Sequence, residues 1–213
     1  MLAECYYRSS VRLLTISPES AAENLALDET LLGRTEEVLR FWESARPVVV
    51  IGRAGRIEDQ VRAEACRADD VEILRRGSGG GAVLLGPGCL NYSLAFSLDA
   101  KPGWRNVGRS FREILSRMAD ALGAGICGQS DLIWQGRKVS GNSQRRTPEK
   151  LLQHGTLLYR FDAELAARYL LEPTRQPKYR RGRQHTEFLG NLPYSALEIQ
   201  RRVADTWGAG ICG

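Results

Sequence analysis

The stretch RRGSGGGAVLLGPGCLNYSL, residues 75–94, decides between the folds open to this chain. Two arginines lead into glycine at four of the five positions 77–81, and a strand-like apolar sequence follows. Glycine backbone lets a ligand approach closely, and main-chain N–H groups beside arginines suit a carboxylate, a phosphate or an acyl phosphate. The apolar residues after the glycines could also admit a slim alkyl chain. The stretch therefore predicts an anion and acyl pocket, with a flexible glycine-rich hairpin as the alternative.

Two common phosphate-binding motifs do not fit this stretch. A P-loop needs a lysine directly after its last glycine, and none follows here. A dinucleotide-binding fingerprint, GxGxxG, needs a helix after the glycines, so that the helix N-terminus meets the pyrophosphate. Ala82 stands where the last glycine should be, and residues 83–94 have the character of a strand. The sequence therefore argues against both nucleotide-binding folds.

The composition is typical of a soluble globular protein. The 213 residues are 43% apolar and 26% charged, with a net charge of +5, which is enough for one large core or two small ones. Basic residues are not gathered with interleaved aromatics on one element, as they are in nucleic-acid binders. We expect no nucleic acid, and instead an acidic protein or a phosphate-bearing small molecule as partner.

The cysteines and the apolar runs indicate the compartment. The number of cysteines is odd and no CxxC pair occurs, which favours neither a disulfide framework nor a zinc site. The five are Cys5, Cys66, Cys89, Cys127 and Cys212. Residues 1–10 contain no apolar signal-peptide core, and the longest aliphatic run, residues 48–51, is too short to span a bilayer. We expect a cytoplasmic protein with reduced thiols and no membrane contact.

Hydrophobic periodicity predicts both helices and strands. The clearest helix covers residues 105–122, where apolar residues recur at steps of three and four until Gly123. A first helix is expected after Ser17 as N-cap; its expected apolar face consists of Ala22, Leu25, Ala26 and Leu32. The other expected helices are 56–70 and 195–206, and the expected strands are 11–16, 47–53, 71–76, 89–98, 131–143 with a turn at Gln135–Gly136, and 153–161. Adjacent strand pairs between helices predict one α+β domain with a mixed β-sheet packed by helices.

Three separated motifs in fixed order carry a family resemblance. LRRGSGGGAVLLGPGCLNYSL (74–94), SDLIWQGRKVSGNSQRR (130–146) and QHGTLLY (153–159) together resemble the catalytic domain of lipoate–protein ligase A and its octanoyl- and lipoyltransferase relatives. ENLALDETLL (23–32) and LRFWESARPVVVIGR (39–53) extend the similarity, which runs from about residue 11 to about 195. The resemblance implies the class II biotin/lipoate protein ligase-like fold. We expect a single catalytic domain over residues 1–213, without the C-terminal accessory domain that full-length ligases of this family append.

The resemblance implies a function as well. Members of this family attach a lipoyl or octanoyl group in amide linkage to one lysine of an acceptor protein. The acceptors are lipoyl domains of 2-oxoacid dehydrogenases or the glycine-cleavage H protein. A separate accessory-domain chain or an acyl carrier protein is a further partner implied by the resemblance.

The resemblance places the site on the glycine stretch and on the GRKVSGN motif. Lys138 is expected to contact the acyl carbonyl and its activating group, because an ammonium in a shielded pocket stabilises charge that develops on these oxygens. A surface lysine is the plain alternative. The expected acyl- and nucleotide-binding residues are Arg76, Ser78, Gly79, Gly80, Gly81, Ala82, Val83, Leu84, Asp131, Gly141, His154 and Gly155. Metal ligands stay open, and His185 is expected to be a loop residue.

Two mechanisms share this scaffold. The triple glycine resembles ligases, which use ATP and Mg²⁺ to form lipoyl-AMP, whereas GQSD (128–131) departs from their usual Gly-Arg-Asn-Asp. Cys127 lies eleven residues before Lys138 and is expected either to form an acyl thioester in a transferase or to be a small packing residue. We expect a ligase first and an ATP-independent transferase second. A non-catalytic acyl- or acyl-AMP-binding subunit that acts with a partner chain is the third reading.

A dense basic run follows in the Pro/Arg-rich stretch 173–183. Its members are Arg175, Lys178, Arg180, Arg181 and Arg183. Such a run is most often a solvated loop. Because the resemblance implies an acidic acceptor domain, docking of the acceptor on this run is the competing hypothesis.

Overall fold

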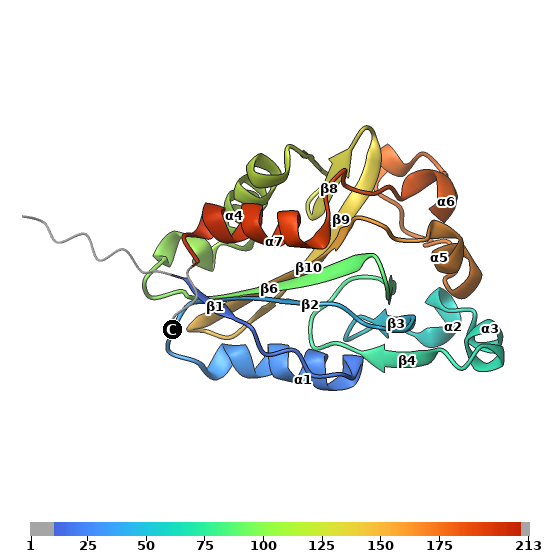
Figure 1. Ribbon diagram of the computed structural model, residues 1–213, viewed down its shortest axis with the longest axis horizontal. Helices are drawn as coiled ribbons and strands as arrows, with labels where there is room; N and C mark the ends of the chain where they lie inside the picture. The colour runs from blue at the N-terminus through green and yellow to red at the C-terminus, as the bar shows by residue number, and fades with distance from the viewer. Residues whose placement is uncertain (1–10, 210–213) are drawn as a thin grey trace, which may run out of the picture.

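The computed structural model describes residues 11–209, so Cys5, Cys212 and the segment considered for a signal peptide lie outside the described residues. A seven-stranded sheet runs through the centre of the molecule (Figure 1). Its strands, in spatial order, are β1 (Arg12–Leu14), β2 (Val38–Trp42), β6 (Cys89–Ser97), β10 (Lys150–Leu158), β9 (Arg137–Arg146), β8 (Asp131–Trp134) and β7 (Gly125–Cys127). β1 and β2 pair in parallel and the other neighbours pair antiparallel. The predicted mixed sheet is confirmed.

A second, three-stranded sheet lies at one end of the large one (Figure 1). Its order is β4 (Glu72–Arg75), β3 (Val48–Ile51), β5 (Val83–Leu85), parallel between β3 and β4 and antiparallel between β3 and β5. The chain leaves this sheet for the large one through a turn at Gly88, which has a φ of 82° and lies directly on the main chain of Arg160 and Phe161. The sequence predicted one sheet, and the division into two corrects it.

Four short helices lie at the same end of the molecule as the small sheet (Figure 1). They are α2 (Ile57–Gln60), α3 (Ala63–Ala68), α5 (Ala163–Tyr169) and α6 (His185–Phe188). The predicted helix over 56–70 is wrong as one element, because Val61 takes an extended conformation and bridges to Leu170 of the segment after α5. The elements that the sequence analysis did not predict are β2, β7, α5 and α6.

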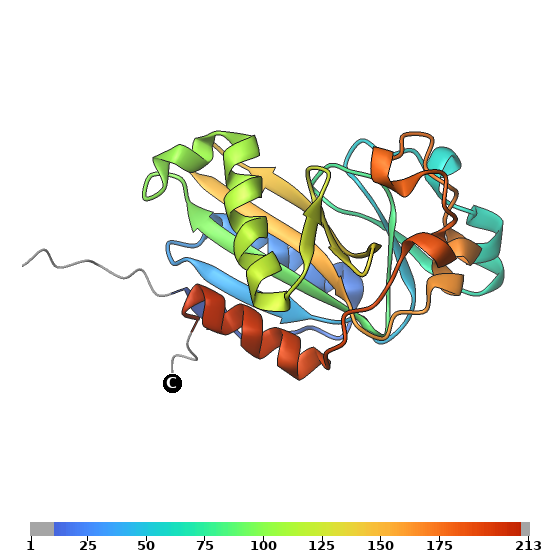
Figure 2. The same cartoon turned by 90° about the horizontal axis from the view of Figure 1, so that it is seen from above.

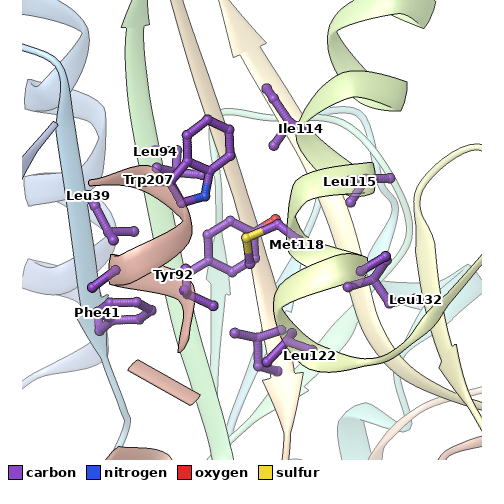
Figure 3. Packing of buried hydrophobic residues seen from close by; sticks show 14 of the residues in the cluster. Leu39, Phe41, Tyr92, Leu94, Ile114, Leu115, Met118, Leu122, Leu132 and Trp207 are labelled. Atoms are coloured by element: carbon purple, nitrogen blue, oxygen red, sulfur yellow. The ribbon is translucent and has the colours of Figure 1, made fainter. Parts of the chain in front are cut away.

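Two long helices cover one face of the large sheet, α4 (Val107–Leu122) and α7 (Ala196–Trp207) (Figure 2). The predicted helix ending at Gly123 is confirmed, with that glycine as a left-handed C-cap at φ 62°. Its N-cap is Asn106, whose side chain accepts a hydrogen bond from the main-chain N–H of Arg109. Side chains from both helices interlock with those of β2, β6 and β8 in one continuous core (Figure 3).

Helix α1 (Ala21–Thr30) covers the opposite face, and here the prediction is wrong twice. The N-cap is Ser20 and not Ser17. The predicted apolar face is wrong in part: Leu25 and Leu32 pack against buried apolar clusters, but Ala22 and Ala26 are exposed while Asn24 and Asp28 are buried. Their partner is the fully buried Arg40 of β2, which donates to Asp28 Oδ1 at 2.6 Å and to the Asn24 side-chain oxygen. Buried polar groups need such partners, so this helix packs by polar side chains as well as by the apolar Ala21 and Leu25.

The remaining elements follow the prediction in kind and differ in length. The turn between β8 and β9 falls at Gln135–Gly136 as predicted, with φ angles of 49° and 75°. Short 3₁₀ turns add η1 (Leu31–Gly33), η2 (Pro102–Arg105) and η3 (Lys178–Arg180). Within residues 11–209, every helix is too short or too polar to cross a bilayer.

Candidate functional site

A cavity of about 720 Å³ opens where the end of the large sheet, the small sheet and residues 172–189 meet. We call residues 172–189 the cap segment and residues 77–82 the glycine loop. The cavity brings together most of the predicted site residues, namely Arg76, Gly79, Gly80, Gly81, Ala82, Val83, Leu84, Asp131, Lys138, Gly141, His154 and Gly155. Ser78 and Cys127 lie next to it without lining it.

Lys138 faces this cavity from the start of β9. Its Nζ lies 2.9 Å from Asp131 Oδ1, and a quarter of its side chain is exposed. Gly141 makes this placement possible, because a Cβ there would lie 3.0 Å from the Nζ. The other carboxylate oxygen, Asp131 Oδ2, accepts a hydrogen bond of 2.6 Å from the hydroxyl of Tyr179 in the cap segment. Burial and Asp131 raise the pKa of Tyr179, which therefore stays a proton donor at neutral pH.

The two arginines before the glycine loop shape it from behind. Arg76 donates to the carbonyls of Val50, Gly79 and Gly81 at 3.1, 2.7 and 2.9 Å and to Ser78 Oγ at 3.1 Å. Burial lowers the pKa of Arg76 to about 10, so the guanidinium is still charged at neutral pH. Arg75 donates to three carbonyls of residues 52–55. Both arginines thus hold main-chain oxygens, which was not predicted, and Arg76 also lines the cavity, as predicted.

The glycines of the loop differ in the space around them and in backbone conformation. Gly80 has a φ of 94°, which disfavours any side chain, and its carbonyl lies against Gly52. Gly79 has open space where a Cβ would stand, and Gly81 has only the Gln60 amide oxygen, 3.8 Å away. Within residues 11–209 no group accepts a hydrogen bond from the N–H of any of these three glycines. These donors can therefore bind an anion that enters the cavity.

His154 supports the glycine loop from β10. Its Nε2 lies 2.5 Å from Ser78 Oγ. Burial and the nearby Arg76 lower the pKa of His154 to about 3, so the ring is neutral at pH 7. The next residue, Gly155, lies against the side chain of Asn142 and leaves no room for a Cβ. Both residues line the cavity.

Cys127 is half-buried at the end of β7. It pairs directly with Asp131 across the β7–β8 hairpin, and directly opposed side chains of an antiparallel pair stand on the same face. The thiol therefore lies beside the Lys138–Asp131 pair without lining the cavity. Cys89, by contrast, is fully buried in the core.

Two expectations about ionisable residues of the cap segment, Arg180 and His185, are wrong. Arg180 is buried and pairs with Glu172, and it lies 4.6 Å over the ring of Phe188. His185, expected to be a loop residue, is buried with its Nδ1 2.8 Å from Glu172 Oε1. The exposed members of the basic run are Arg175, Lys178 and Arg181.

Several polar residues of the site were missed. Asn142 accepts from the buried hydroxyl of Tyr92 at 2.5 Å and donates to the Ser130 carbonyl at 2.8 Å, and Gln60 accepts from the N–H of Ala82 at 2.6 Å. Asn142 stood inside the GRKVSGN motif and could have been singled out. Nothing in the sequence marked Gln60 or Tyr179. Within residues 11–209, no cluster of three or more His, Cys, Asp or Glu side chains could hold a metal ion.

Comparisons with known proteins agree with this fold. Residues 20–192 match the model of the lipoyl protein ligase A/B catalytic domain. The structure is similar to a bipartite lipoate protein ligase of Thermoplasma acidophilum, solved in a study with its E2 lipoyl domain, with a TM-score of 0.80, 22% identity and coverage of 95% of this chain and 86% of that one. It is also similar to a lipoate-protein ligase A bound with ATP, with a TM-score of 0.77, 20% identity and coverage of 95% and 87%. A third similar structure is protein Ta0514 of T. acidophilum with bound lipoic acid. It has a TM-score of 0.79 and 20% identity, with coverage of 93% of this chain and 84% of that one.

Proposed function

The chain belongs to the lipoyl protein ligase A/B catalytic domain family, and on this premise we propose that it attaches lipoate or octanoate to a lysine of an acceptor protein through an acyl-AMP intermediate. The observation that carries the proposal is the Lys138 ammonium, held in the same cavity as the three free N–H groups of the glycine loop. One cation and a set of main-chain donors face a space large enough for an acyl adenylate.

The chemistry takes two steps. A carboxylate oxygen of the fatty acid attacks the α-phosphorus of ATP and pyrophosphate leaves, which gives the acyl-AMP. The neutral amine of the acceptor lysine then attacks the acyl carbonyl, the C–N bond forms, the C–O bond to AMP breaks, and the amine proton passes to solvent. Lys138 stabilises the negative charge that grows on the carbonyl and phosphate oxygens in both steps. Mg²⁺ would travel with ATP and neutralise its phosphates.

The apolar part of the cavity supports an alkyl ligand. Leu84, Leu158, Phe161 and Leu170 line it and belong to the core between the small sheet and α5. These side chains can bury an eight-carbon chain, and each buried CH₂ contributes roughly 0.8 kcal/mol. The polar groups at Lys138 then bind the carboxyl end.

A two-tube assay tests the proposal. The first tube contains the protein, octanoate or lipoate, ATP, Mg²⁺ and a lipoyl domain; the second contains octanoyl acyl carrier protein and no ATP. Mass spectrometry of the acceptor should show the acyl adduct in the first tube. If neither tube contains product, even after a candidate accessory chain is added, the proposed enzymatic activity is refuted. The acyl-binding subunit is then the remaining interpretation.

A transferase is the second candidate, and the pairing of Cys127 with Asp131 is the observation that favours it. The thiolate would take the acyl group from the carrier thioester, release the carrier thiol and pass the group to lysine. Product only in the second tube, lost in Cys127→Ala, would establish this mechanism. The position of Cys127 outside the cavity lining makes it our second choice.

The acceptor is proposed to be a lipoyl domain or an H-type protein, docked on the exposed part of the basic run. Arg175, Lys178 and Arg181 provide its charge. Reversing these three charges should raise the KM for the acceptor and flatten its salt dependence. An unchanged salt profile would remove this docking site. Whether residues 1–213 act alone or with an accessory chain is decided by the same assay.

A further inference from the structure

The carboxylate of Asp131 is held between two different parts of the chain. Lys138, on β9, is bound to Oδ1, and Tyr179, in the 3₁₀ turn η3 of the cap segment, donates to Oδ2. The Asp131 side chain is only 10% exposed. Because each oxygen has its own partner, the carboxylate cannot rotate without breaking one of the two contacts.

The cap segment fixes where the Tyr179 hydroxyl lies. The chain reverses just after it, at Arg181 and Gly182, with φ angles of 54° and 73°. Arg183 returns to donate to the Tyr179 carbonyl and to the Gly136 carbonyl, both at 3.1 Å. The Tyr179 ring also packs on Phe188, with ring centres 5.3 Å apart.

The same segment is attached to the strand that carries Lys138. The N–H of Gly190, the residue directly after the cap segment, donates to the Lys138 carbonyl at 2.9 Å. The neighbouring Arg137 donates to the carbonyls of Thr186 and Glu187 at 2.7 and 3.1 Å. The backbone of Lys138 is therefore tied to one end of the cap segment, and its ammonium is tied through Asp131 to Tyr179.

We infer that Tyr179 is a positioning residue, whose hydroxyl holds Asp131 so that the Lys138 ammonium is aimed at the reacting carbonyl before substrate arrives. The inference rests on the proposed function of Lys138. A charge held in advance does not have to be reoriented in the transition state, and this is where fixed groups contribute most. Tyr179 does not itself touch the reacting atoms in this scheme.

A double-mutant cycle tests the connection. Tyr179→Phe keeps the ring on Phe188 and removes only the hydroxyl; it should lower kcat about tenfold, as expected for one hydrogen bond to a charged group, with the KM for the acyl substrate within about twofold. In an Asp131→Ala background, Tyr179→Phe should have no further effect, because the group through which it acts is gone. If the two substitutions each lower kcat by their full separate factors in the double variant, the inference is wrong.

Tyr159→Phe is the matched control. Its hydroxyl also donates to a carboxylate, that of Glu43, at 2.9 and 3.1 Å, and Tyr159 does not line the cavity. This variant should keep wild-type kcat. If it lowers kcat as much as Tyr179→Phe does, the effect is general loosening and the inference fails.

A second readout does not depend on activity. The rate at which an amine-reactive reagent labels Lys138, followed by peptide mass spectrometry, should change several-fold in Tyr179→Phe and stay at the wild-type value in Tyr159→Phe. An unchanged rate in Tyr179→Phe would refute the positioning role. If the wild-type protein transfers no acyl group in either tube, the proposed function fails, and the labelling still decides whether Tyr179 controls Lys138.

Discussion

The molecule has two large clusters of buried apolar side chains, and they differ in how tightly they are packed. Between the large sheet and α4 and α7, the core is solid, and Ile114, Leu115 and Met118 have no exposed surface. Around the small sheet, an equally apolar set of side chains encloses a cavity of about 720 Å³. The solid half is built from long elements with regular periodicity, and the hollow half from short helices, glycines and paired arginines.

Stability and function are therefore expected to depend on different residues of this chain. Long amphipathic helices supply enough contact to fold the chain. The hollow half can then keep open space and charged groups that a packed core would exclude. Substitutions in the two halves should therefore separate into those that lower the melting temperature and those that lower activity.

The largest effect on stability is expected from the solid half. Leu115→Ala leaves a space under α4 and should cost about 2–5 kcal/mol in the free energy of unfolding. Denaturant titration measures it, with Leu197→Ala, at a position 55% exposed, as a control near zero. Below its melting temperature the Leu115 variant should retain acyl transfer. Loss of activity without loss of stability would contradict the comparison.

The largest effect on activity is expected from Lys138→Met. Loss of one preorganised cation should lower kcat by roughly a hundredfold to a thousandfold, about 2.7–4 kcal/mol, while the melting temperature stays close to that of the wild type. Lys150→Met, at the opposite end of β10 from the cavity, is the matched control. Full activity in the Lys138 variant would remove the proposed mechanism.

A smaller effect is expected at an open glycine. Gly79→Ala meets no atom of the protein within 4 Å and projects into the cavity lining. It should leave stability unchanged and raise the KM for the acyl substrate about tenfold, which is about 1.4 kcal/mol. Gly33→Ala is its control, because that glycine also has open space and does not line the cavity. Equal KM values for the two variants would place the ligand elsewhere.

The effect that is smallest at neutral pH is a pH dependence of stability from His154, which grows as the pH falls. Its folded pKa of about 3 lies below the ordinary value of 6.5, so the unfolded chain binds a proton between these values while the folded chain does not. Stability should therefore fall as pH drops from 6.5 towards 3, by at most about 1.4 kcal/mol per pH unit from this residue. His154→Gln should flatten the slope of unfolding free energy against pH. Burial also lowers the pKa of His185, which leaves part of the slope in place.

Periodicity predicted the solid half well and the hollow half poorly. α4 was predicted almost to its ends because its apolar residues recur every three to four positions. α1 was misjudged because its buried face is polar and is satisfied by Arg40, a residue of a strand that was not predicted. Local patterns carry no information on a partner that is distant in sequence.

The site shows the same limit. The motifs singled out Lys138, Asp131 and the glycine loop, because each of these stretches carries the family pattern. The structure brings them to one cavity. Arg76 lines the cavity as predicted, but its contacts with main-chain carbonyls were not predicted, because they depend on the folded loop. Tyr179 was missed because only the tertiary fold brings the cap segment to β8.

The paths of β9 and β10 have one more consequence. The two strands pair as far as Asn142 and Gly155, and from there β9 follows β8 while Thr156 and Leu157 continue along β6. The two strands thus separate at the cavity. The line along which they separate, which we call the seam, forms part of the cavity wall. Main-chain groups along a seam keep their polarity whatever side chains evolve around them. Substitutions of the surrounding side chains can therefore change the shape of the cavity without removing these main-chain groups from its wall.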